Sequence, residues 1–116
     1  LTLDHHHHDT FAPDFNGRNA QLRRRLQELG LGLVVETGAR YLLDPRQKHE
    51  PTLLSPSAAG RQRRLEFLTR CLDVCAACQG ETVSFWAGVP QPGVSRQQAW
   101  DWLLDGLRQV EAAARQ

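Results

Sequence analysis

The stretch that decides the fold is LGLVVET at residues 31–37, a short apolar run rich in β-branched side chains and followed by Gly38. Runs of this kind are typical of strands that are buried on both faces of a parallel sheet. The stretch TVSFWA at residues 82–87 repeats the signature and precedes a loop rich in glycine and proline. We therefore predict two strands, at 31–37 and 82–87.

Three helical patterns alternate with these strands. Leucines at helical spacing, closed by Gly30, predict a helix over residues 18–29. A longer amphipathic pattern predicts a second helix over 57–79, and Ser95 with Gln98 forms a capping box that starts a third. The order helix, strand, helix, strand, helix makes two β/α units, whose strands are parallel because a helix joins them. The predicted class is α/β.

Two parallel strands with helices on one side leave one sheet face open, although parallel sheets are normally covered on both faces. Further strands, or assembly into a homo-oligomer, are needed. An open nucleotide-binding sheet would carry the motif G-x-G-x-x-G after a strand, and the turns at Gly38 and Gly88 lack it. A closed barrel takes about 250 residues, so this chain of 116 residues is expected to form a partial (β/α)8 TIM barrel, about two β/α units with a preceding helix.

The chain divides into a polar, His-rich N-terminal segment at 1–17 and a barrel fragment at 18–116. It starts at Leu1, contains no methionine, and ends at Gln116 inside a helical pattern that no stop signal follows. We therefore expect it to be part of a longer protein.

Charge and hydropathy exclude several classes of partner. The chain has 14 basic and 13 acidic side chains and a net charge of +1, whereas nonspecific nucleic-acid binding depends on a clustered excess of Lys and Arg. No stretch approaches the roughly 18 to 20 apolar residues of a membrane span, and no secretory signal is present. We expect no nucleic-acid or membrane partner and, because closely spaced thiols suit a reducing compartment, a cytoplasmic location.

Alternation along the predicted strands assigns their two faces. Glu36 and Trp86 share the face opposite to the helices and lie near the C-terminal ends of their strands, where barrel enzymes place binding and catalytic groups. An unpaired buried carboxylate is costly, so we expect Glu36 to pair with another group. The helix-facing set is Leu33, Val35, Val83 and Phe85.

The connection at residues 38–56 is far longer than the usual two to six residues of such loops. It carries several charged side chains suited to gripping a hydroxylated or phosphorylated small molecule by charge-assisted hydrogen bonds. A solvated connector stiffened by its prolines is the alternative interpretation. The charged set is Arg40, Arg46, Lys48, His49 and Glu50.

Two further clusters of side chains are candidates for metal binding. Cys71, Cys75 and Cys78 have the C-x-x-x-C-x-x-C spacing of radical S-adenosylmethionine enzymes, but they fall on the apolar stripe of a predicted helix, where buried core thiols are the favoured interpretation. The tract His5–His8 could bind a divalent metal. Four consecutive histidines cannot all face one ion, so an incidental polar tract is favoured and no metal site is predicted on this chain.

The chain resembles the sugar phosphate isomerase/epimerase family, the xylose isomerase-like barrels, at ETGARYLLDPRQKHEPTLLSP and, after one helix, at VSFWAGVP. The resemblance covers about residues 20–116 and implies a (β/α)8 barrel. Such enzymes interconvert ketoses and aldoses or epimerise them by proton transfer, commonly with Mn²⁺, Mg²⁺ or Co²⁺ held by two Glu, an Asp and a His of later strands.

Those later strands are absent from this chain, so the resemblance implies a fragment that is inactive alone and gives Glu36 no role as a metal ligand. It implies a small-molecule partner, a sugar or sugar phosphate. Two alternatives remain, a non-catalytic sugar-binding barrel and a radical enzyme that uses the cysteines. By analogy, the side chains that line the sugar pocket are Glu36, Arg40, Lys48, His49 and Trp86.

Overall fold

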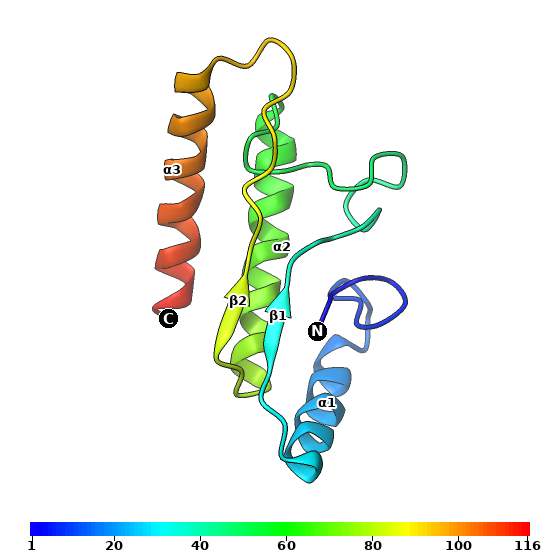
Figure 1. Cartoon of the computed structure of the whole chain (residues 1–116). Coiled ribbons are helices and arrows are strands. Elements are labelled where there is room, and N and C mark those ends of the chain that lie inside the picture. The colour runs from blue at the N-terminus through cyan, green and yellow to red at the C-terminus, as the bar shows by residue number, and fades with distance from the viewer.

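A computed structural model describes residues 1–116. The elements follow the predicted order: α1 (Phe15–Leu29), β1 (Val34–Glu36), α2 (Ala58–Ala77), β2 (Thr82–Ser84) and α3 (Arg96–Ala114). Figure 1 shows α2 behind the two strands, with α1 and α3 on either side. The class is α/β, as predicted.

The two strands pair in parallel, with Val35 opposite Val83 at the centre of the register. The ladder is shorter than the predicted runs at 31–37 and 82–87. At its start, the backbone N–H of Leu31 donates to the carbonyl of Leu26 at 3.0 Å, so this residue completes the C-terminus of α1. Beyond Glu36 the chain turns away from the sheet.

The first three residues form a third extended segment beside β1. The backbone nitrogen of Leu1 donates to the carbonyl of Val34 at 2.8 Å, and the N–H of Glu36 donates to the carbonyl of Leu1 at 2.7 Å. Thr2 lies opposite Glu36 in a parallel bridge. The segment is therefore followed by its own loop and helix, α1, as a further β/α unit. The predicted division at residues 17 and 18 falls within α1.

Local sequence signals account for most helix ends. Gly30 ends α1 with a left-handed φ of 62°, a conformation that glycine adopts without steric cost. The Ser57 side chain accepts from Gly60 at the start of α2, and the predicted capping box of Ser95 and Gln98 is present in α3. The predicted helix at 57–79 ends two residues earlier, because Gln79 has a φ of 57°.

The core lies between α2 and one face of the sheet. Val35, Phe67 and Cys71 are fully buried there. Val34, of the opposite parity, is 49% exposed, so the predicted assignment of the two faces is confirmed. A second cluster joins α2 to α3 around Leu53. None of the helices is long and apolar enough to span a membrane.

The Leu3→Ala variant tests whether residues 1–3 are part of the folded core. The Leu3 side chain is fully buried in the main core, and such truncations destabilise proteins by about 2–5 kcal/mol. We expect a loss in this range in urea unfolding. Leu1→Ala is the matched control, since Leu1 is 38% exposed, and it should change the free energy of unfolding much less. Equal effects of the two substitutions would contradict a structural third strand.

Candidate active site

Three loops meet at one edge of the sheet. They occupy residues 4–14, 37–57 and 85–95 and follow the N-terminal segment, β1 and β2. Because all three extended segments run in parallel, their C-terminal ends open on the same side of the molecule. This is the side on which barrel enzymes carry their active sites.

Glu36 ends β1 and is exposed on the open face of the sheet. Its side chain makes no hydrogen bond and no ion pair anywhere in residues 1–116. The expected partner of Glu36 is therefore not found within residues 1–116, where its face of the sheet is uncovered and the carboxylate is exposed. Glu36 remains free to meet a ligand at the sheet edge.

His49 and Trp86 are brought together from two different loops. Their rings are 5.4 Å apart at an interplanar angle of 73°, an edge-to-face contact. The Nδ1 atom of His49 lies 3.1 Å from the carbonyl of Gly38, so Nδ1 carries the proton and Nε2 is left as an acceptor. Trp86 is 44% exposed, so part of its apolar ring surface faces solvent at the edge of the sheet.

Arg40 and Lys48 stand on the two arms of the loop at 37–57. The N–H of Tyr41 donates to the carbonyl of Lys48 at 3.0 Å, so the two arms are held side by side. Both cationic side chains are exposed, and neither makes an ion pair. Ala39 and Tyr41 have φ values of 47° and 53°, a strained conformation for residues other than glycine.

The loop at 4–14 contains a carboxylate–imidazole pair that the sequence analysis did not predict. The Asp4 carboxylate lies 2.8 Å from Nδ1 of His7 and accepts the backbone N–H groups of His6 and His7. Burial alone would raise the pKa of Asp4, but these hydrogen bonds outweigh it and lower the pKa below the ordinary value. Nε2 of His7 makes no hydrogen bond and faces solvent.

The rest of the histidine tract is ordered by local contacts. Nδ1 of His5 lies 3.1 Å from the Asp9 carboxylate. His8 is buried, and its Nε2 lies 2.7 Å from the side-chain oxygen of Asn19 in α1. In the sequence, only the spacing of the Asp and His residues indicates these pairs. Their place at the sheet edge depends on the extended segment at residues 1–3.

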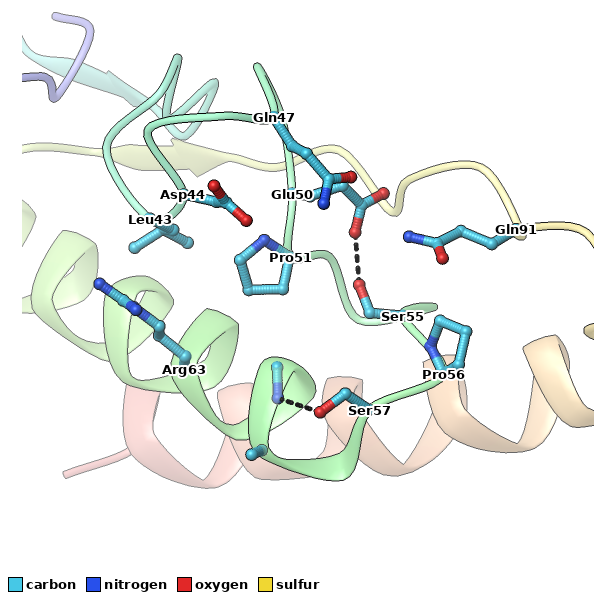
Figure 2. A pocket seen from close by; sticks show the side chains of 12 residues that line it. Leu43, Asp44, Gln47, Glu50, Pro51, Ser55, Pro56, Ser57, Arg63 and Gln91 are labelled. Atoms are coloured by element: carbon cyan, nitrogen blue, oxygen red, sulfur yellow. Dashed lines mark hydrogen bonds between the residues drawn. The ribbon is translucent and has the colours of Figure 1, made fainter.

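A polar cleft of about 460 Å³ lies between the loop after β1 and the N-terminus of α2, with Gln91 from the loop after β2 at its border. Figure 2 shows the Glu50 carboxylate at this cleft, accepting the Ser55 hydroxyl. The distance is 2.6 Å. Glu50 therefore has a defined place at the rim, while none of the five residues predicted for the sugar pocket lines this cleft.

The loops after β1 and β2 are in direct contact at Gly88. A Cβ atom at this position would lie 2.6 Å from Thr52, and the φ of Gly88 is 102°. Only glycine satisfies both constraints. The close approach brings the segments that carry His49 and Trp86 against each other.

The three cysteines are core residues. Cys71 and Cys75 lie in α2 and Cys78 caps it; all three are buried and free. Burial raises the pKa of each thiol, that of Cys71 to about 12. Cluster ligands are thiolates, so this environment opposes the iron–sulfur alternative.

The comparison with protein families gives one result that bears on this arrangement. The model of the xylose isomerase-like TIM barrel matches residues 2–116. The chain belongs to the xylose isomerase-like TIM barrel family. Comparison with curated proteins and with solved structures gives no match.

Residues 1–116 do not form a metal site by themselves. Across residues 1–116, no group of three or more His, Cys, Asp and Glu side chains is placed to hold a metal ion. The Asp4 carboxylate is hydrogen-bonded to His7. No catalytic step is therefore assigned to a metal on this chain.

The burial of Cys71 predicts that its thiol is inert in the folded protein. With a pKa of about 12, Cys71 is about 10⁻⁴ thiolate at pH 8, and the thiolate is the reactive form. We expect Cys71, the only thiol of the three that is 0% exposed, to react very slowly with a disulfide reagent at pH 8 and fast in denaturant, measured by absorbance. Rapid labelling of all three thiols in the folded protein would contradict the buried environment of Cys71.

Proposed function

We propose that the chain supplies the substrate-binding edge of a sugar or sugar phosphate isomerase or epimerase. The observation that carries the proposal is the meeting of three loops at the C-terminal edge of parallel strands in a xylose isomerase-like barrel. These loops present an apolar wall at Trp86, two unpaired cations and ionisable groups with free lone pairs. This combination suits a polyhydroxylated, anionic or neutral small molecule.

The reaction that fits these groups is proton transfer next to a sugar carbonyl. A base removes the proton from the hydroxyl-bearing carbon beside the carbonyl, and the carbonyl oxygen takes up a proton to give an enediol. Return of the carbon-bound proton to the former carbonyl carbon, with loss of the proton of the neighbouring hydroxyl, gives the isomer. Its return to the opposite face of the original carbon, with loss of the proton from the former carbonyl oxygen, gives the epimer. His7 is suited to hold that proton, since Asp4 fixes its Nδ1 and leaves Nε2 free. The Glu36 carboxylate, at the end of the adjacent strand, is suited to accept sugar hydroxyls.

The proposal includes a divalent metal, Mn²⁺, Mg²⁺ or Co²⁺, in the complete barrel. Its ligands would come from strands other than those of residues 1–116, and it would polarise the carbonyl and hydroxyl oxygens of the sugar. Two or three β/α units do not enclose a substrate, so we propose that this chain is inactive alone.

Solvent exchange tests the proposal most directly. The protein with its complete barrel is incubated in D₂O with ketoses, aldoses and their phosphates, with each of the three metals, and followed by ¹H NMR. We expect deuterium at the carbon beside the carbonyl, together with the isomer or epimer. Sugar binding without exchange would favour the non-catalytic sugar-binding barrel. The absence of both binding and exchange would refute a sugar function.

The two cations of the loop after β1 predict a preference among ligands. Removing both in Arg40→Ala/Lys48→Ala should weaken the binding of a sugar phosphate about tenfold or more, since hydrogen bonds to charged groups are worth about 1.5–3 kcal/mol. Binding of the neutral sugar should change little. Arg24→Ala, an exposed cation in α1, is the control. Isothermal titration of both ligands measures the difference, and equal losses for the two would contradict phosphate recognition.

Asp4→Asn tests the role of the Asp4–His7 pair. Asn keeps a side-chain oxygen for the backbone N–H groups of residues 6 and 7 but removes the negative charge beside the imidazole. We expect kcat to fall about 10²-fold, the lower range of general acid–base contributions, with the fold retained. His6→Asn is the control, because the His6 side chain makes no hydrogen bond. Equal kinetics for the two variants would exclude His7 from the proton transfer.

A further inference from the structure

Arg64 of α2 is fully buried, with a relative exposure of 0%. One nitrogen of its guanidinium, Nη2, donates to the carbonyl of Thr37 at 2.8 Å. The other two nitrogens, Nε and Nη1, are buried without a hydrogen-bond partner. No carboxylate lies within ion-pair distance of this side chain.

This environment does not favour folding. Burial lowers the pKa of Arg64, and the charge interactions with Cys71 and Glu50 offset the effect only in part. A buried charge without an opposite charge, with two unmatched donors, is less favourable than an apolar side chain of similar size. Buried polar groups without partners call for an explanation other than stability.

The contacts of Arg64 lead to the rim of the sheet. Thr37 is the first residue after β1, and its carbonyl is the acceptor of the guanidinium. The next carbonyl, that of Gly38, is the partner of Nδ1 of His49. His49 in turn packs against the Trp86 ring in an edge-to-face contact. A continuous series of contacts therefore links Arg64, on the buried face of α2, to His49 and Trp86, two of the residues predicted to line the pocket.

The guanidinium is itself held in place. It lies over the ring of Phe67, with 5.3 Å between the guanidinium carbon and the ring centroid, and Phe67 is fully buried in the core. The strained backbone at Ala39 and Tyr41 begins directly beyond the Thr37–Gly38 segment. Strained segments persist where surrounding contacts fix them, and the hydrogen bond from Arg64 is such a contact.

We propose that Arg64 is a positioning residue, which fixes the backbone at the end of β1 so that Gly38 holds His49 against Trp86. Its relevance to sugar binding rests on the proposed function. The positioning itself is independent of any substrate and is measured without one.

Arg64→Met tests the proposal. Met keeps the length of the side chain and removes the charge and the donors. We expect a melting temperature no lower than that of the unchanged protein, together with clear shifts of the Trp86 indole N–H and the His49 ring signals in NMR spectra. Arg63→Met is the matched control, because Arg63 is the adjacent, exposed residue of the same helix, and it should leave these signals in place.

Two results would overturn the proposal. The first is a folded Arg64→Met protein in which the His49 and Trp86 signals match those of the unchanged protein. The second is a fall in melting temperature with shifts spread over the whole core, which would indicate a general packing role. Loss of sugar conversion is a separate result and bears only on the proposed function.

If the Arg64→Met protein does not fold, the Arg64→Lys variant tests the positioning role instead. Lys restores a charged donor for the Thr37 carbonyl, so the His49 and Trp86 signals should lie close to those of the unchanged protein. A folded Lys variant that keeps the backbone signals of Thr37 and Gly38 but displaces those of His49 and Trp86 would show that Arg64 does not act through this segment.

Discussion

The burial of one face of β1 against α2 is the constraint on which the rest of the structure depends. Val35 and Phe67 are fully buried at this contact, and the strand is only three residues long. Because side chains alternate along a strand, burying Val35 places Val34 and Glu36 on the opposite face. The same contact sets the register with β2, where Val35 lies opposite Val83.

The parallel direction of the strands then determines where the residues of the candidate site lie. Parallel strands present their C-terminal ends together, so segments distant in the sequence meet at one edge. The loop of His49 and the loop of Trp86 touch there because Gly88 packs directly on Thr52. The histidine tract reaches the same edge only through the segment that begins at Leu1 and pairs with β1.

Much of the fold was predictable because its signals are local. The capping box at Ser95, the glycine after α1 and the alternation around Val35 each act within a few residues. The extended segment at residues 1–3 was missed, since three residues give no period and its evidence is the pairing with β1. The exposure of Glu36 was missed because burial depends on the elements that cover a face, which a strand's own sequence does not report.

The places where local rules are broken lie close together. A buried guanidinium without a carboxylate at Arg64 and left-handed backbone at Ala39 and Tyr41 all surround the end of β1. Each is unfavourable by itself, and chains tend to retain such features at functional sites. The loop predicted from its length and charge is the same segment that these features fix in place. The loop is ordered by its own hydrogen bonds together with the bond from Arg64 of α2. Because the partner in α2 is distant in the sequence, composition indicated a binding loop but not the contact between His49 and Trp86.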